Sequence, residues 1–245
     1  MLPSFPERGV HVSASYEVQL LGAVPCGDDL LTCRFSRPEN YAFRAGQWFR
    51  LTLVTPHGEI TKTFSHCSSP HDPDLEMTTR LSGSPFKDAL KVLVPGDRVR
   101  IMGPGGKLSI PSDIDSLCFL AGGVGITPVR SLLREAQHTG RAFADALLLY
   151  ANRDESCVPF AEEFLLMGGM GVRTVLCFEH ASEGWAGERG FVTAGTVRRH
   201  IDLLDGRAFL VAGPPVMVAA MEGVLDELGI PEGLRIVERF GAPTA

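Results

Sequence analysis

Residues able to contact a phosphate and a planar ring follow one another in the segment 62–70, KTFSHCSSP. Lys62 offers a positive charge to a phosphate, Phe64 a face to an aromatic ring, and Ser65 a hydroxyl to a polar ring edge. This set suits a ligand that carries both a phosphate and an aromatic ring. Taken singly, Phe64 is more typical of a core and Lys62 of a solvated surface.

A glycine-rich turn occupies residues 121–128, AGGVGITP, directly after an apolar run. Glycines let the backbone approach a phosphate closely, and the free N–H groups at a helix start attract it. Thr127 is the expected N-cap of the following helix and Pro128 its first residue. Such turns also occur for packing reasons, and this one lacks the third glycine of the dinucleotide fingerprint. The candidate contacts are Gly122, Gly123, Gly125, Thr127 and Pro128.

A turn of the same design, residues 211–217 (VAGPPVM), again lies between an apolar run and an amphipathic stretch. In a parallel sheet such turns emerge at the carboxyl edge, where ligands bind. Two of them at one edge therefore favour a nucleotide site. The candidate contacts here are Gly213, Pro214, Pro215 and Met217.

The segment 150–155, YANRDE, follows the strand predicted between these two turns, and Asn152 is a candidate contact there. Arg153 can pair with the 2′-phosphate of a ribose, whereas Asp154 or Glu155 can accept a hydrogen bond from a ribose hydroxyl. Residues suited to a 2′-phosphate and residues suited to a free ribose hydroxyl are both present, so the sequence leaves the choice of nucleotide open. A polar loop that caps a helix is an equal alternative for any one of these residues.

Short strands must position the first segment, because β-rich runs alternate with turn residues up to about residue 102 at the spacing of an all-β barrel. Hairpin turns are expected at 27–29 and 56–58. One helix is expected at 85–92, with Ser84 as its N-cap and Pro85 at its first position. The predicted strands are 16–24, 30–35, 47–55, 59–65, 75–81 and 98–102.

The pattern of apolar residues changes after the polar stretch 111–116. From there on, compact apolar strands alternate with amphipathic stretches of helix length. This pattern predicts a parallel sheet with helices on both faces. The charge changes at the same place: residues 1–112 carry 12 Lys and Arg against 11 Asp and Glu, and residues 113–245 carry 11 against 18. We therefore expect two domains, 1–112 and 113–245. The predicted strands of the second are 117–121, 146–151, 173–178, 208–212 and 235–238.

Composition excludes several classes of protein. A net charge of −6 disfavours a nucleic-acid binder. The longest nearly apolar stretch, 117–126, is about half of a bilayer span, and no basic-then-apolar start opens the chain, so a cytoplasmic protein without a membrane span is expected. No two cysteines have the close spacing of a zinc or iron–sulfur site, so no metal site is expected. Reduced thiols are expected at Cys26, Cys33, Cys67, Cys118, Cys157 and Cys177.

Five features in a fixed order resemble the ferredoxin–NADP reductase-like flavoprotein superfamily over roughly residues 16–240. They are Lys62-Thr63-Phe64-Ser65, Ser84, the turn 122–128, Gly213-Pro214-Pro215-x-Met217 and Glu238-Arg239-Phe240. The resemblance implies an antiparallel β-barrel that holds FAD, followed by an α/β domain with a parallel sheet that holds NAD(P)H. A fused iron–sulfur domain is absent from this pattern.

Roles follow from the resemblance residue by residue. Lys62 and Ser84 correspond to contacts of the FAD pyrophosphate, Phe64 to the residue that packs on the isoalloxazine ring, and Ser65 to the hydroxyl at its N5 edge. Thr127 and the 213–215 turn correspond to the nicotinamide flank, and Glu238 and Phe240 to residues that approach the ring from the chain's end. Catalytic roles are thus implied for Ser65, Thr127 and Glu238. Cofactor contacts are implied as well for Thr63, Gly122, Gly123, Gly125, Pro128, Asn152, Arg153 and Met217.

The chain departs from the family pattern at four places. Lys62 stands where Arg is usual, which replaces a two-point guanidinium contact by a point charge. Phe64 stands where Tyr is usual, so a hydroxyl contact is lost while stacking is kept. Ala212 stands where many members have Cys before the Gly-Pro-Pro turn. The tail 241–245 lacks a terminal Tyr, so only Phe240 remains to shield the other face of the flavin.

The implied function is electron transfer from NAD(P)H through FAD to a separate one-electron carrier such as ferredoxin or flavodoxin. An acidic carrier can be steered to the less acidic first domain, where four arginines are candidates for the docking surface; they are Arg34, Arg37, Arg44 and Arg50. Two alternatives remain: an NAD(P)H-dependent flavin reductase that releases its flavin, and a non-catalytic nucleotide-binding subunit of a redox assembly.

Overall fold

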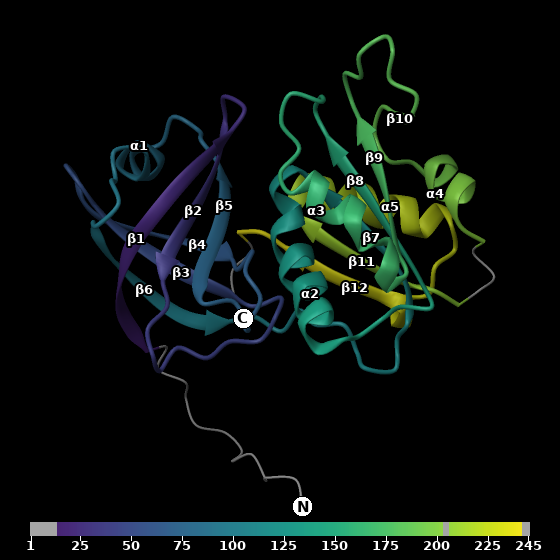
Figure 1. The fold of residues 1–245 in the computed structure, drawn as a ribbon. Coiled ribbons are helices and arrows are strands. Elements are labelled where there is room, and N and C mark those ends of the chain that lie inside the picture. Colours follow the sequence, from purple (N-terminus) through teal and green to yellow (C-terminus); the bar gives the residue numbers. More distant parts are fainter. Residues whose placement is uncertain (1–13, 203–205, 242–245) are drawn as a thin grey trace, which may run out of the picture.

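Two six-stranded sheets lie side by side in the computed structural model, which describes residues 14–202 and 206–241 (Figure 1). The first sheet is antiparallel, with strand order β4-β3-β6-β1-β2-β5. Its edge strands β4 and β5 contact each other, so the sheet curls into a barrel, as predicted. Its strands are β1 (Ser15–Cys26), β2 (Leu30–Ser36), β3 (Trp48–Thr55), β4 (Gly58–Ser65), β5 (Asp74–Arg80) and β6 (Arg98–Gly105).

One helix, α1 (Pro85–Lys91), covers an end of the barrel. Ser84 is its N-cap and accepts a hydrogen bond from the Lys87 N–H, while Pro85 occupies the first turn, as the sequence predicts. Phe86 and Leu90 point into the barrel core, because positions four apart share one face of a helix.

The second sheet is parallel, with strand order β10-β9-β8-β7-β11-β12, and confirms the predicted α/β class. Only β10, two residues long, was not predicted, because so short a strand leaves no periodic pattern. The strands are β7 (Ser116–Gly122), β8 (Asp145–Asn152), β9 (Val172–Phe178), β10 (Glu188–Arg189), β11 (Ala208–Gly213) and β12 (Arg235–Arg239). The helices are α2 (Ile126–Thr139), α3 (Ala161–Leu165), α4 (Ala194–His200) and α5 (Pro215–Glu227), and the 3₁₀ turns are η1 (Gly123–Gly125), η2 (Leu166–Met170) and η4 (Glu232–Leu234).

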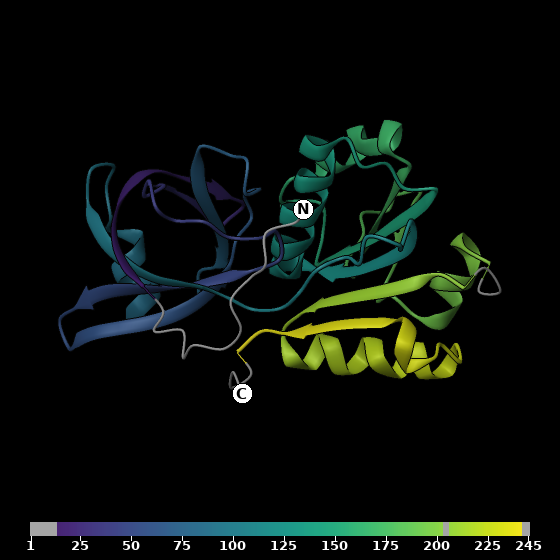
Figure 2. The same cartoon turned by 90° about the horizontal axis from the view of Figure 1, so that it is seen from below.

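Helices cover both faces of the parallel sheet, as expected (Figure 2). Leu117 and Phe119 of β7 pack in one core with α2 and α3, while Cys118 and Leu120 pack in a second core with α4 and α5. Successive side chains of a strand point to opposite faces, so a strand covered on both sides is apolar throughout. The carboxyl ends of β7 and β11 point toward the barrel (Figure 2).

The start of α2 corrects one prediction. Thr127 is not the N-cap; the helix begins at Ile126, directly after the 3₁₀ turn η1, with Gly125 before it. The Thr127 hydroxyl instead donates to the carbonyl of Val124, 2.9 Å away. A side-chain cap requires an extended residue before the helix, and η1 already winds as a helix there.

A disulfide joins Cys26 to Cys157, so the expectation of reduced thiols is wrong for this pair. The two cysteines are separated by 131 residues, but the end of β1 and the loop after β8 bring their Cα atoms to 5.5 Å. Sequence spacing carries no sign of such a pairing. Gly27, with φ +57°, gives the β1–β2 hairpin the left-handed residue that lets it approach Cys157. The other four cysteines are buried and form no disulfide within the described residues.

Candidate functional site

A cleft with a volume of about 410 Å³ opens between the barrel and the carboxyl edge of the parallel sheet. Both sheets contribute to it. Of the predicted site residues, the cleft brings together Thr63, Phe64, Ser65, Thr127, Glu238 and Phe240. Its other lining residues are Trp48, Thr78, Thr79, Gly106, Lys107, Val124, Val237, Arg239 and Gly241.

Two aromatic side chains give the barrel side of the cleft its shape. Phe64 ends β4 half-buried, tilted against Phe86 with 5.6 Å between ring centroids. Trp48, which pairs with Ser65 across β3 and β4, lies flat on the backbone of Gly105 and Gly106, where a Cβ would overlap its indole. Sequence analysis missed Trp48; the glycine pair opposite a strand that begins with Trp is the signal that could have found it.

The two glycine-containing turns lie at one edge of the parallel sheet, as the sequence predicts, and they also touch. β7 and β11 are neighbours, and a Cβ on Gly125 would overlap the carbonyl oxygen of Ala212. The Phe240 N–H donates to the carbonyl of Gly213 at 2.8 Å, which ties the end of the described chain to the second turn. Because these backbones touch, side chains are excluded from the junction.

Glu238 and Thr127 lie in the cleft on the side of the parallel sheet. Burial raises the pKa of Glu238 to about 7. Thr127 is buried, at the first turn of α2. The cleft therefore contains a carboxyl group whose charge changes near neutral pH.

A second cavity, of about 290 Å³, contains Asn152 and Arg153 together with Asp29 and Arg80 of the barrel, whose side chains form an ion pair. The Asn152 Nδ2 is buried without a hydrogen-bond partner among the described residues. It is an unused donor at the carboxyl end of β8.

The contacts of the polar loop after β8 differ among Arg153, Asp154 and Glu155, which the sequence left as alternative ribose or phosphate contacts. Asp154 accepts hydrogen bonds from the N–H, at 2.9 Å, and the hydroxyl of Ser156, and Glu155 accepts from the Ser182 N–H at 2.9 Å. Arg153 is exposed, and within the described ranges its guanidinium makes no hydrogen bond. The cation of this loop is thus available to a ligand while both carboxylates are engaged.

The remaining predicted residues lie outside both cavities. Lys62 is exposed on β4, and Ser84 caps α1. The Met217 sulfur packs against Gly122 and Gly213, so one side chain contacts both glycine turns. Gly122, Gly123, Gly125, Pro128, Gly213, Pro214 and Pro215 form the turns themselves and do not line either cavity. Residues 242–245 of the tail lie outside the described residues.

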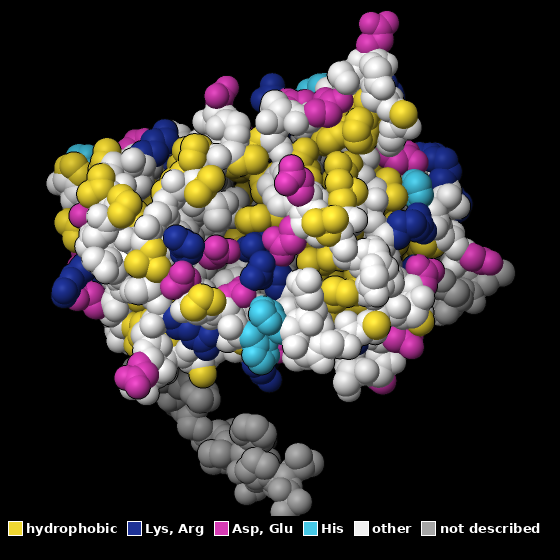
Figure 3. Space-filling view, viewed as in Figure 1, with side chains coloured by type: hydrophobic (Ala, Val, Ile, Leu, Met, Phe, Trp, Pro, Cys, Tyr) yellow, Lys and Arg dark blue, Asp and Glu magenta, His cyan; other side chains and the backbone are white. Residues whose placement is uncertain are grey.

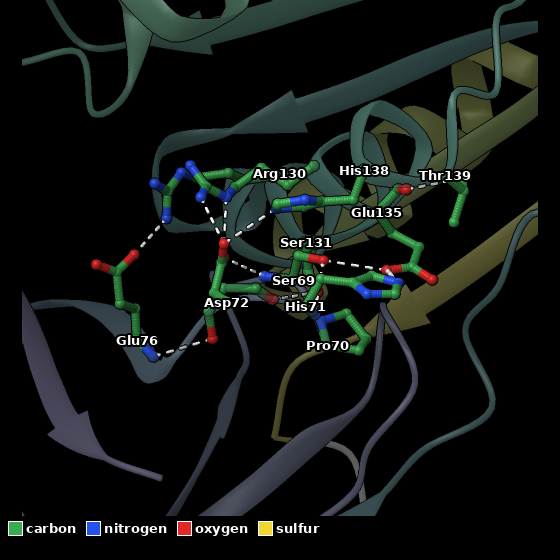
Figure 4. Close-up of polar contacts among 12 residues, drawn as sticks. Ser69, Pro70, His71, Asp72, Glu76, Arg130, Ser131, Glu135, His138 and Thr139 are labelled. Carbon is green, nitrogen blue, oxygen red and sulfur yellow. Dashed lines mark hydrogen bonds and ion pairs between the residues drawn. The ribbon is translucent and has the colours of Figure 1, made fainter.

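Helix α2 makes polar contacts with the loop that connects β4 and β5 and with β5 itself (Figure 4). Arg134 donates to Asp72 at 3.0 and 2.6 Å, and Arg130 donates to Glu76 at 2.6 Å. On the face shown in Figure 3, charged and histidine side chains gather along this seam. The network fixes α2 relative to the loop that follows β4 and to β5.

Further polar contacts follow the same seam: Ser131 Oγ to Ser68 O at 2.7 Å, Ser69 Oγ to Glu135 at 3.0 Å and His138 to Asp72 at 3.2 Å. Arg37, expected on a docking surface, instead supports this loop. Its guanidinium donates to the carbonyls of Tyr41, Pro70 and Asp72. Arg44, by contrast, is exposed.

None of the described helices combines the length and apolar character that a bilayer span requires. Within residues 14–202 and 206–241, no three His, Cys, Asp or Glu side chains gather as metal ligands.

Comparison with known proteins gives consistent results. Residues 119–223 match a family model described as an oxidoreductase NAD-binding domain. The chain is 29% identical over 238 residues to ferredoxin–NADP reductase B of Sorangium cellulosum, covering 92% of this chain and 97% of that protein. It is 30% identical over 218 residues to NADH-cytochrome b5 reductase 1 of Cryptococcus neoformans, covering 81% and 73%.

A solved structure has the same fold. A ferredoxin NADP+ reductase from Neisseria gonorrhoeae, with bound FAD and NADP, superposes with a TM-score of 0.81 at 23% identity, covering 92% of this chain and 98% of that one.

Proposed function

The chain belongs to the ferredoxin–NADP reductase-like family of NAD(P)H- and FAD-dependent oxidoreductases, and from that premise we propose that it passes electrons from NAD(P)H through FAD to a separate one-electron carrier protein. The carrier is acidic, of the ferredoxin or flavodoxin type. We further propose that residues 1–112 hold the flavin and residues 113–245 the nicotinamide nucleotide.

One observation supports this function above the others: a single cleft is lined by Phe64 and Ser65 of the barrel and by Thr127 and Glu238 of the parallel-sheet half. Hydride transfer needs two planar rings stacked at about 3 to 3.5 Å with water excluded. A cleft between one ring-binding half and one nucleotide-binding half meets that need.

The residues present fit a flavin. Phe64, Trp48 and Phe240 supply aromatic surface to the cleft, and the Ser65 hydroxyl stands beside Phe64 for a polar ring edge. Lys62 and Ser84 are the proposed pyrophosphate contacts, with Thr63 beside them. When bound there, FAD would supply the exchange between two-electron and one-electron transfer, which is chemistry that side chains alone do not supply.

The residues present also fit NAD(P)H. The 122–125 and 213–215 turns expose backbone without side chains between them, and Asn152 carries a buried donor that has no partner in the described chain. Arg153 is free at the edge of that site. These are the features that a nucleotide with phosphates and ribose hydroxyls requires.

The chain's own groups have three tasks. Thr127 and the Gly213-Pro214-Pro215 turn flank the nicotinamide and set its orientation, while Phe64 and Phe240 exclude water. Glu238 holds a proton below pH 7 and a negative charge above it. The contacts between α2 and the β4–β5 loop keep the two halves in register.

The test is anaerobic reduction of the purified protein. We expect a yellow protein whose flavin band bleaches with NADPH or NADH and recovers when an acidic one-electron carrier is added. Protein that purifies colourless and consumes NAD(P)H only with added free flavin would favour the flavin reductase. A yellow protein that neither nucleotide bleaches would favour the non-catalytic subunit.

The carrier has a test of its own. Arg44 is exposed on the barrel half, and the Arg50 guanidinium lies 5.5 Å from the ring centroid of Trp48, which lines the cleft. Arg44→Glu with Arg50→Glu should slow electron transfer to an acidic carrier about tenfold at low salt, and less at high salt, because steering is screened. Arg198→Glu, on α4 of the other half, is the matched control and should leave the rate unchanged. Equal rates in all three proteins would contradict the docking surface.

A further inference from the structure

Lys87, in α1, has an ammonium group that no carboxylate neutralises within the described part of the chain. Its Nζ lies 4.6 Å from the centroid of the Phe64 ring and 5.4 Å from that of Phe86, and it donates a hydrogen bond to the Thr79 hydroxyl. The residue is half-buried, and burial lowers the pKa of Lys87 to about 8. A cation withdrawn from water without a counter-ion costs free energy unless an anion joins it.

The other charges nearby do not relieve this cost. The thiol of Cys33 faces the ammonium, but burial raises the pKa of Cys33 to about 12, so the thiol is neutral. The positive charge of Lys62 is close enough to lower the pKa of Lys87 further. The two lysines therefore repel one another, and within the described residues no ion pair neutralises either ammonium group.

The position of this pair connects it to the cleft. Phe64 and Thr79, two of the three residues that Lys87 contacts, both line it. Lys62 lies two residues before Phe64 on β4. An anion that enters beside Phe64 comes within reach of both lysines.

We propose that Lys87 is a binding residue for the pyrophosphate of FAD, and that with Lys62 it presents two ammonium groups to the two negative charges of that group. This rests on the proposed function, because it requires FAD beside Phe64. It also accounts for a lysine at position 62: a second point charge replaces the two-point contact that a guanidinium would make.

The experiment measures flavin binding to the flavin-free, full-length chain by fluorescence, for FAD and for riboflavin, which lacks both phosphates. Lys87→Gln should weaken FAD binding about 10- to 100-fold, the usual loss for a hydrogen bond to a charged group, and should leave riboflavin binding unchanged. Lys87→Arg should retain most of the affinity for FAD. Added salt should weaken FAD binding more in the wild type than in Lys87→Gln.

Lys91→Gln is the matched control, because Lys91 lies on the same helix, is exposed and pairs with Asp88 at 3.9 Å. It should bind FAD as the wild type does. Equal losses for FAD and riboflavin in Lys87→Gln would place the contact at the ring and overturn the proposal, as would no loss at all. Unchanged thermal unfolding of the flavin-free variants shows that they fold. A wild-type chain that binds no FAD would instead refute the proposed function.

Discussion

Cys26 and Cys157 are joined by a disulfide that links the barrel to the nucleotide-binding half of the chain. Cys26 ends β1, and Cys157 follows the loop that contains Arg153. The bond therefore tethers that loop to the β1–β2 hairpin, beside the cavity that contains Asn152.

Reducing this disulfide should destabilise the protein. Closing a loop of this length lowers the entropy of the unfolded chain, which corresponds to about 5 kcal/mol in the chain-entropy account. Urea unfolding of the wild type should show a lower midpoint when a dithiol is present. The double variant Cys26→Ser/Cys157→Ser should have the midpoint of the reduced wild type, and the dithiol should not change it. Thiol titration of the unreduced, unfolded wild type should count the four free cysteines. Six reactive thiols would contradict the bond.

The seam between α2 and the β4–β5 loop should make stability fall in acid. Burial alone would raise the pKa of Asp72, but hydrogen bonds from Arg134 and from the Ser69 N–H outweigh it and hold the pKa below its usual value. The stabilisation is therefore present above pH about 4 and is lost as pH falls through the lowered pKa. Asp72→Asn should cost about 1 to 3 kcal/mol at pH 7 and flatten the acid limb of the stability profile. An acid limb as steep as that of the wild type would contradict this origin.

The sequence predicted much of the fold because its signals are local. Turn-bounded β-rich runs marked the strands of the barrel, compact apolar runs marked those of the parallel sheet other than β10, and Ser84-Pro85 marked the start of α1. The two glycine turns were expected at one edge of the sheet, because parallel strands have their carboxyl ends at the same edge; the contact of Gly125 with Ala212 goes beyond that expectation. The roles of the site residues stay predictions.

Other features depend on contacts between distant parts of the chain. The Cys26–Cys157 bond requires the two halves to be placed, and so does the use of Arg37 in bonding three carbonyls. Lys87 reads as a solvated helix residue until its Nζ is found over Phe64. The roles of such residues depend on their burial and on their contact partners, and a local sequence pattern predicts neither.

Glu238 should give flavin reduction a dependence on pH near 7. Burial raises its pKa to about 7, so the carboxyl is neutral below that pH and ionised above it. A nicotinamide that loses hydride becomes positive, and a nearby carboxylate stabilises that charge. The single-turnover rate of reduction should therefore rise with pH through 7 in the wild type. Glu238→Gln should remove this rise, and an unchanged profile would remove Glu238 from the reaction.

The same group affects stability in the opposite direction. A raised pKa favours the protonated form in the folded chain, so Glu238 lowers stability as pH rises from about 4.5 toward 7. Glu238→Gln should abolish that part of the decline in urea unfolding measured across this range.

Gly125→Ala should abolish nucleotide binding and leave the flavin in place. The new Cβ would overlap the carbonyl oxygen of Ala212, so the two turns must separate. NADPH should then fail to bleach a protein that still purifies yellow. Gly223→Ala is the control: it lies in α5 with open space at its Cβ, and it should add about 0.5 to 1 kcal/mol of stability. If Gly125→Ala lost its flavin while Gly223→Ala kept it, that result would contradict the division of the two cofactors between the halves.

Arg153 should make the protein prefer NADPH to NADH. Asp154 is engaged by Ser156 and Glu155 by Ser182, whereas the Arg153 guanidinium has no hydrogen-bond partner in the described chain. Only the cation is thus free to read the ribose, and a guanidinium binds a 2′-phosphate by charge-assisted hydrogen bonds. Arg153→Leu should raise the KM for NADPH about 10- to 100-fold, with little effect on NADH. Glu155→Gln is the control and should change the KM for either nucleotide by less. A wild type that prefers NADH would contradict this role of Arg153 and would show that Asp154 or Glu155 leaves its serine partner to bind the ribose.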